Sequence, residues 1–322
     1  MRLLCGSSVG ARDDGILVVA FDDSLNILST VTLRMVPGAH SLAAVPLPSG
    51  TLLVSGHGMK GVASQDPSVI NTWRETSDGG WRWLGASAGG GISPNCSAID
   101  PPGEWIVVTH YSSLDQTGRL TLLPVGPDGL PCKVAEALKL PGSGPSKRQN
   151  SSHPHCARAL GGNRFAVADL GTDGVHLFAV ESGSLVERAR LDCPPGTGPR
   201  TIAVRPDGKQ WYVTGELSSN LLVVAVDGDT LRLEQEISMI PDDWEGDNAP
   251  SEVVANSRTG VVYAANRGHD SVAIFRIQGD RLESSGHLPS GGCSPRGLAI
   301  SPDGRLLAIA NEKSDNVRVV RL

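Results

Sequence analysis

Histidine, arginine and glutamate side chains recur in this 322-residue sequence where the strands of a repeated unit begin or end. Together these residue types can do chemistry: guanidinium groups bind carboxylate or phosphate oxygens, and an imidazole or a carboxylate can take a proton from water. Aligning the repeated units on their turns gives two sets of equivalent positions. The residues that enter the first strand of a unit are Asn95, His155, Arg200, Ser251 and Arg296. The residues that leave the second strand are His57, Tyr111, Leu170, Glu216, Arg267 and Glu312.

The two sets of positions are expected to lie close together. In an antiparallel hairpin, the residue that enters the first strand and the residue that leaves the second strand share one end. A purely structural position in a repeat should hold similar small or apolar residues, whereas these positions hold unlike ionisable groups. The pattern therefore predicts a concave polar binding site. The alternative is a set of solvated charges on surface loops.

The units that carry these positions are copies of one another. Their first residues are Ala39, Pro94, Pro154, Pro199, Pro250 and Pro295. Each copy has a short apolar strand, a turn with glycine, a second strand, a polar loop and an alternating third strand, and most have a fourth strand. The turn glycines, 44 to 59 residues apart, are Gly50, Gly103, Gly162, Gly208, Gly260 and Gly304. This period is typical of four-stranded propeller blades.

The repeats predict an all-β fold with little helix, because no segment keeps a 3.6-residue apolar period over three turns. The N-terminal stretch adds three more strands, in residues 1–8, 15–22 and 26–33. We therefore predict a single domain over residues 1–322, a seven-bladed β-propeller with four-stranded blades and the polar site at its central channel mouth. The last unit reaches Leu322 without a fourth strand. A six-bladed or incompletely closed ring is the alternative.

Several motifs resemble the lactonase family of seven-bladed propellers, which contains bacterial-type 6-phosphogluconolactonases and fungal carboxy-cis,cis-muconate lactonizing enzymes. The motifs, within about residues 89–322, are GSGPSKRQNSSHPH, ADLGTDGVHLF, GPRTIAV with GELSSN, ANRGHDSVAIF, and SPRGLAISPDGRLLAIANEKSDNV. The first 88 residues match in outline only. By position, the resemblance implies that the catalytic residues are His155, Arg200, Glu216 and Arg267. The sequence departs from the family at Gly215 and His110, where the family usually has asparagine, and in lacking the closing C-terminal strands.

The resemblance implies a lactonase of the 6-phosphogluconolactonase type that hydrolyses a sugar-acid lactone. Arg200 and Arg267 would bind an anionic substrate, and an arginine would stabilise the charge that develops on the carbonyl oxygen. His155 or Glu216 would act as the general base toward water. The same groups could instead serve a carboxy-cis,cis-muconate lactonizing enzyme, a cycloisomerase, and the sequence does not separate the two reactions.

Further substrate-binding candidates surround these four residues. The longest interval between repeats holds the insertion LPGSGPSKRQNSSHPH, a loop that could fold over the same opening and bring Arg148 to it. The other candidates are His153, Arg296 and Asn266. His153 and His155 alternate and would share one face of a strand, which suits a metal, but no third ligand is adjacent. We therefore expect no metal and no cofactor.

Composition excludes several other classes. With a net charge of −6 and no long basic stripe, nucleic-acid binding is not expected. No stretch approaches the ~20 apolar residues of a membrane span, so no membrane partner is expected. The six cysteines are scattered without a CxxC pair and no export signal is visible, which favours reduced thiols and a cytoplasmic protein. A non-catalytic interaction scaffold remains an alternative, and the oligomeric state stays open.

Overall fold

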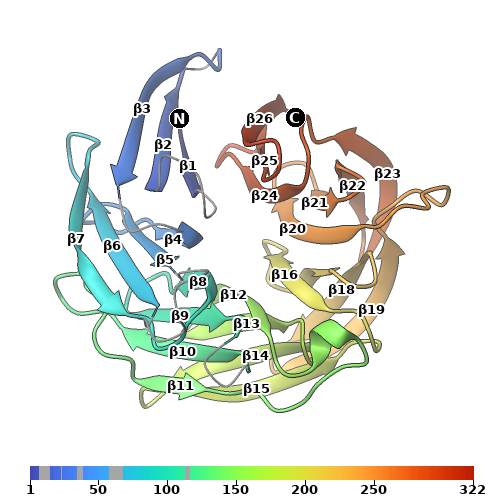
Figure 1. Ribbon diagram of the computed structural model, residues 1–322, viewed down its shortest axis with the longest axis horizontal. Helices are drawn as coiled ribbons and strands as arrows, with labels where there is room; N and C mark the ends of the chain where they lie inside the picture. Colours follow the sequence, from blue (N-terminus) through green and yellow to red (C-terminus); the bar gives the residue numbers. More distant parts are fainter. Residues whose placement is uncertain (7–14, 23, 35–38, 58–67, 113–116) are drawn as a thin grey trace. The chain divides into compact units, whose positions relative to one another are not determined.

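The structure is a computed structural model that describes the chain except for residues 7–14, 23, 35–38, 58–67 and 113–116. Within the described residues the chain forms seven antiparallel sheets, five with four strands and two, the first and the last in the sequence, with three (Figure 1). The described residues contain one short 3-10 helix, η1 (Lys147–Gln149), and no α-helix. The predictions of an all-β chain and of little helix are confirmed.

The described part of the chain forms two compact units. The first comprises residues 1–140, 159–165 and 179–186, and the second comprises residues 141–158, 166–178 and 187–322. The prediction of a single domain is not tested by this division and stays a prediction.

The first unit contains three complete sheets, and the predicted N-terminal strands form the first of them. That sheet consists of β1 (Arg2–Gly6), β2 (Gly15–Phe21) and β3 (Ile27–Arg34). The next consists of β4 (Ala39–Val45), β5 (Leu52–His57), β6 (Val69–Glu75) and β7 (Trp81–Ala88). The third consists of β8 (Pro94–Ile99), β9 (Trp105–His110), β10 (Arg119–Pro124) and β11 (Glu136–Leu138).

A fourth sheet has residues in both units, and three further sheets lie in the second unit. The fourth consists of β12 (Pro154–Gly161), β13 (Arg164–Asp169), β14 (Gly174–Glu181) and β15 (Ser184–Asp192). The next two consist of β16 (Pro199–Val204), β17 (Gln210–Gly215), β18 (Asn220–Asp227) and β19 (Thr230–Ser238), and of β20 (Ala249–Asn256), β21 (Val261–Arg267), β22 (Ser271–Gln278) and β23 (Arg281–Pro289). The last consists of β24 (Pro295–Ile300), β25 (Leu306–Asn311) and β26 (Asn316–Arg321).

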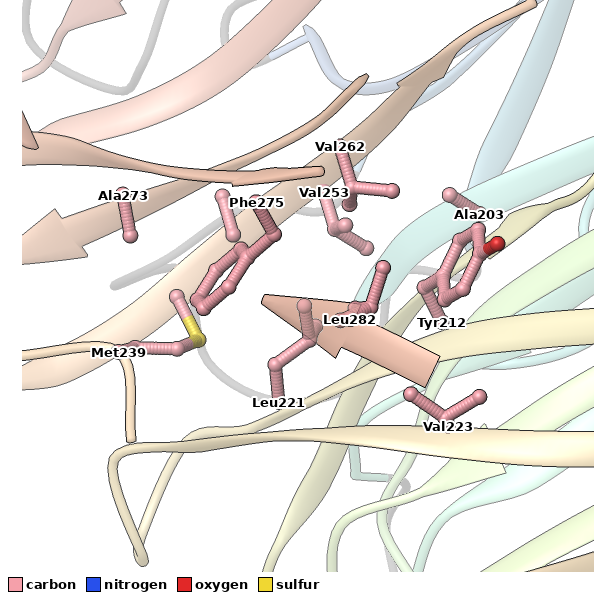
Figure 2. Close-up of a cluster of buried hydrophobic side chains, with 11 residues drawn as sticks. Ala203, Tyr212, Leu221, Val223, Met239, Val253, Val262, Ala273, Phe275 and Leu282 are labelled. Carbon is pink, nitrogen blue, oxygen red and sulfur yellow. The ribbon is translucent and has the colours of Figure 1, made fainter. Parts of the chain in front are cut away.

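Apolar side chains pack the β16–β19 sheet against the β20–β23 sheet. Figure 2 shows part of this cluster, in which Tyr212 and Leu221 come from one sheet and Val262 and Phe275 from the other. All four side chains are fully buried or nearly so. Burying a side chain of this size contributes about 1.5–3 kcal/mol. This packing holds the ends of β17 and β21 in place, and candidate site residues lie at these ends.

Among the described residues, no helix has the length and apolar character needed to cross a membrane.

Candidate active site

Arg200 lies where β16 departs from regular pairing. The register of β16 with β17 shifts between Pro199 and Ile202, which marks a β-bulge. Similar shifts follow Pro250 in β20 and Pro295 in β24. Proline fits the start of a strand because it has no N–H to donate, and a bulge bends the strand and re-aims its side chains. The repeated proline-plus-bulge start therefore turns the next side chain away from the regular face of the sheet.

Glu216 follows the last residue of β17, and its backbone N–H donates to the carbonyl oxygen of Gly198 at 2.9 Å. The Glu216 side chain is 4% exposed and touches three guanidinium groups. Its Oε1 lies 2.7 Å from Arg148 Nη1 and 3.0 Å from Arg267 Nη2. Its Oε2 lies 2.8 Å from Arg200 Nε, in an ion pair without the alignment of a hydrogen bond. The carboxylate is thus the centre of an arginine cluster.

Arg267, the last residue of β21, is held by backbone oxygens of the paired strand β20. Its Nε donates to the carbonyl oxygen of Ala249 at 2.9 Å, and its Nη2 donates to that of Pro250 at 3.3 Å. The side chain is 16% exposed. These bonds orient the guanidinium plane before any substrate is present.

The loop before β12 supplies Arg148 to the arginine cluster. Its short helix η1 begins with a capping box between the preceding serine and Gln149. The buried Gln149 amide donates to the carbonyl oxygen of Leu170 at 2.9 Å and to Asp173 Oδ1 at 2.7 Å. These bonds attach the loop to the β13–β14 turn and leave Arg148 beside the carboxylate. Sequence reasoning missed Gln149, although a serine followed three residues later by glutamine is a recognisable cap signal.

His155 is the second residue of β12 and is 9% exposed. Burial lowers the pKa of its imidazole well below the usual value, and the charges of Arg200 and Arg296 lower it further, while Glu216 opposes the shift. The imidazole is therefore neutral at neutral pH. Its coupling to these three groups shows that His155 lies within electrostatic reach of the arginine cluster.

The same charges set the state of the cluster. Burial by itself raises the pKa of Glu216, but the charges of Arg200, Arg267 and Arg148 hold it far below its usual range. A protonated His155 would act in the same direction, but this imidazole is neutral at neutral pH. Burial lowers the pKa of Arg200 to about 10, against the opposing charge of Glu216, so Arg200 remains protonated. Three guanidinium groups around one carboxylate leave an excess of two positive charges.

Arg296 lies at the edge of this cluster. Its Nη1 is 3.1 Å from Glu312 Oε2, and its side chain is about half exposed. Its charge contributes to the lowered pKa of both His155 and Arg200. Arg296 therefore lies at the more exposed side of the site, and its predicted substrate contact stays a prediction.

His153 takes part in a different network. Its Nε2 lies 3.0 Å from Asn150 Oδ1, and its backbone N–H donates to Asp169 Oδ1 at 2.7 Å. These bonds hold the end of the loop against β13. Among the described residues, no group of three or more His, Cys, Asp or Glu side chains is arranged to hold a metal ion.

Asn266 is fully buried, and its amide connects strands rather than the arginine cluster. Its Nδ2 donates to the carbonyl oxygen of Met239 at 2.6 Å, at the end of the preceding sheet. Side chains at the same place in other sheets make equivalent contacts, Asn311 with the oxygen of Ser290 at 3.2 Å and His110 with that of Gly89 at 3.1 Å. The repeat favours a structural role for Asn266, and its predicted substrate contact stays a prediction. The equivalence also explains how a histidine replaces asparagine at position 110.

Other residues at the two sets of predicted positions make structural contacts. The Ser251 hydroxyl donates to the carbonyl oxygen of Pro295 at 2.6 Å. Asn95 Oδ1 accepts from the backbone N–H of Tyr111 at 3.0 Å. The side chain of His57 lies outside the described residues.

The family model described as "Lactonase, 7-bladed beta-propeller" matches residues 3–322. The chain belongs to this lactonase family. The predicted seven-bladed propeller is thereby confirmed over the six-bladed alternative, and the two sheets with three strands are the first and last of the seven.

Individual relatives of this lactonase-family chain carry related names. A 6-phosphogluconolactonase of Bacillus subtilis is 32% identical over 233 residues, which are 70% of this chain and 65% of the relative. One from Formosa agariphila is 30% identical over 251 residues, 72% of this chain and 67% of the relative. The match to the Bacillus protein thus spans slightly less than two thirds of that relative's length.

Solved structures share the fold at lower identity. The periplasmic gluconolactonase of Pseudomonas aeruginosa superposes with a TM-score of 0.90 at 24% identity, covering 99% of this chain and 91% of that one. A putative 6-phosphogluconolactonase of Bacteroides fragilis gives 0.85 at 23% identity, covering 99% and 89%. These likenesses establish the architecture of the family member.

Proposed function

We propose that this protein hydrolyses a sugar-acid lactone, the reaction indicated by the name 6-phosphogluconolactonase that two of its relatives carry. One observation carries the proposal: a buried carboxylate surrounded by three guanidinium groups lies within electrostatic reach of a neutral imidazole. The combination offers a cationic anchor for oxygen anions and a group that can accept a proton. Because the chain belongs to the lactonase family, we infer that the bond hydrolysed is the ester bond of a lactone ring.

Binding relies on the excess positive charge of the arginine cluster. Planar guanidinium groups bind carbonyl, carboxylate and phosphate oxygens with paired donors. Arg200 and Arg267 are held in place by the strands that carry them, so little reorganisation is needed when a substrate arrives. Arg148, which is about half exposed, can move to meet the substrate.

In the chemical step, a water oxygen adds to the lactone carbonyl carbon while His155 accepts one proton from that water. The carbonyl π electrons move to oxygen, and Arg200 or Arg267 stabilises the resulting oxyanion. The oxyanion then re-forms the carbonyl, the ring C–O bond breaks, and the leaving ring oxygen takes the proton from His155. The product is the open hydroxy acid, and the imidazole is neutral again.

His155 is the better general base of the two predicted candidates. The very low pKa of Glu216 makes its carboxylate a weak base, and each of its oxygens already lies against a guanidinium group. The pKa of His155 is also low in the unliganded site, because burial and then nearby positive charge disfavour a protonated imidazole. A bound anion and the developing oxyanion add negative charge, which raises the pKa of this imidazole as the reaction proceeds. Glu216 then acts by positioning the arginines.

The test is lactone opening by the purified protein above the spontaneous rate, followed by proton release with D-gluconolactone and 6-phosphogluconolactone. His155→Asn is expected to lower kcat by about a hundredfold or more if it transfers the proton. Arg200→Gln is expected to raise KM and lower kcat, while the surface variant Arg190→Gln serves as the matched control. Cyclisation of 3-carboxy-cis,cis-muconate with no lactone opening would instead assign the protein to the cycloisomerase reaction.

A cytoplasmic site of action forms part of the proposal. It is supported by the six cysteines, none of which forms a disulfide. Cell fractionation with an antibody to the protein tests it, and recovery from an extracytoplasmic fraction contradicts it.

A further inference from the structure

A cleft of about 480 Å³ adjoins Arg267. It is open to solvent and lies between the β19–β20 and β23–β24 loops and the ends of β21 and β25. The residues that line it are Asp247, Asn248, Ala249, Arg267, Gly268, Asp270, Cys293, Ser294, Glu312 and Lys313. Arg267 therefore belongs both to the arginine cluster and to this cleft.

The charge of the cleft differs from that of the arginine cluster. Its lining includes two cationic side chains, Arg267 and Lys313, and three acidic ones, Asp247, Asp270 and Glu312. A ligand with several carboxylates is disfavoured there. Hydroxyl groups suit it, because an ionised carboxylate only accepts hydrogen bonds and a hydroxyl can donate one.

Two of the three carboxylates already have partners. Glu312 pairs with Arg296 at 3.1 Å. Asp270 Oδ1 accepts from the backbone N–H of Ser294 at 2.7 Å. In the described part of the chain, the Asp247 carboxylate makes no hydrogen bond or ion pair and is exposed. Asp247 is the acidic group of the cleft that remains available to a ligand.

The backbone holds Asp247 in a fixed place beside Arg267. Gly268, which follows Arg267, has a φ of +115°, and a Cβ there would lie 2.1 Å from the carbonyl oxygen of Asp247. Only glycine allows this close approach. The next residue, Asn248, donates from Nδ2 to Asn266 Oδ1 at 3.1 Å. The loop is thus packed against the turn that ends β21.

We propose that this cleft binds the hydroxyl-bearing part of the substrate and that Asp247 is a specificity-determining residue that accepts hydrogen bonds from substrate hydroxyl groups. The inference rests on the proposed lactone hydrolysis. Arg267 contacts the reacting end of the lactone, and the hydroxyl-bearing carbons extend into the cleft toward Asp247. The acidic lining also disfavours a tricarboxylate such as 3-carboxymuconate in this position.

The experiment compares kcat/KM for D-gluconolactone with kcat/KM for δ-valerolactone, which has the same ring size and no hydroxyl groups. Asp247→Ala is expected to lower the ratio of the two values by about tenfold, the order expected for a lost hydrogen bond to a charged group. The value for δ-valerolactone should stay unchanged. Asp247→Asn, which keeps one acceptor oxygen, should give an intermediate ratio. Asp243→Ala, an exposed carboxylate of the same loop that does not line the cleft, is the matched control.

The outcomes separate the two proposals. An unchanged ratio in Asp247→Ala, with both lactones still opened, overturns the hydroxyl-binding assignment and leaves the hydrolase proposal standing. An equal loss of kcat/KM with both lactones also overturns it, because it shows a general effect rather than hydroxyl recognition. A wild-type protein that opens neither of these lactones nor 6-phosphogluconolactone overturns the proposed function itself.

Discussion

Replacing Glu216 by glutamine keeps the shape of the side chain and removes its charge. In the structure this carboxylate contacts three guanidinium groups, two of which belong to largely buried side chains, Arg200 at 5% and Arg267 at 16% exposure. Removing one partner of a buried ion pair costs about 3–5 kcal/mol, because the remaining charge is left uncompensated. The half-exposed Arg148 adds under about 1 kcal/mol. We therefore expect Glu216→Gln to lower the free energy of unfolding by about 3–5 kcal/mol.

The dependence on pH has a definite sign. The folded-state pKa of Glu216 is lowered, so its contribution is fully present above the pKa of an unfolded glutamate, about 4.3. The contribution is lost only as the pH falls through the lower folded value. The difference between wild type and Glu216→Gln should therefore be constant between about pH 6 and 8 and shrink below about pH 4.

Chemical denaturation at low salt, with and without inorganic phosphate, measures both effects. In the variant the three guanidinium groups become an anion site, so phosphate at about 100 times its Kd should restore about 2.7 kcal/mol. Wild type should gain less, because Glu216 already occupies the cluster. The control is Asp192→Asn, which removes a surface pair with Arg190 and should cost under about 1 kcal/mol. Equal stability of Glu216→Gln and wild type at neutral pH would refute the charge argument, as would equal stabilisation of both proteins by phosphate.

Three further predictions follow from the same contacts. Because the lowered pKa of His155 keeps its imidazole neutral, lactone opening should persist below pH 6.5, the usual histidine pKa, and fall only in more acidic buffer; a pH–rate profile that declines at or above that value contradicts this. Arg148→Gln should raise KM for an anionic lactone about tenfold while changing the free energy of unfolding by under about 1 kcal/mol, as measured by steady-state kinetics and denaturation. Asn266→Ala should cost about 1–3 kcal/mol of stability because it removes two hydrogen bonds, to the carbonyl oxygen of Met239 and from the Asn248 amide, with kcat and KM near the wild-type values; a selective rise in KM would restore Asn266 as a substrate contact.

The repeats explain why so much of the fold could be predicted. Turn glycines recur at nearly regular intervals, and alternating apolar residues between them leave few choices except short antiparallel strands. The strand positions that carry Arg200, Glu216 and Arg267 follow from the same alignment. Their roles could not follow from it, because equivalent positions in other copies hold Ser251, which bonds a backbone carbonyl, or other structural residues.

The remaining features of the candidate site depend on contacts between segments that lie far apart in the sequence. Gln149 and Glu216 lie far apart in the sequence. Only the folded structure shows that the hydrogen bonds of Gln149 hold the loop in place and that Arg148 on this loop contacts Glu216. The choice of His155 over Glu216 as base also depends on burial and neighbouring charge, which set a pKa that residue type alone does not reveal.

By itself, the sequence determined the strand pattern, the repeat period and the ends of the strands at which ionisable side chains gather, because these depend on local alternation and turn chemistry. The tertiary structure decided which of those side chains meet, which are neutral or charged, and which, like Asn266, bond to the backbone of a neighbouring sheet. Such properties depend on distances and desolvation between segments far apart in the chain, and no local pattern encodes them.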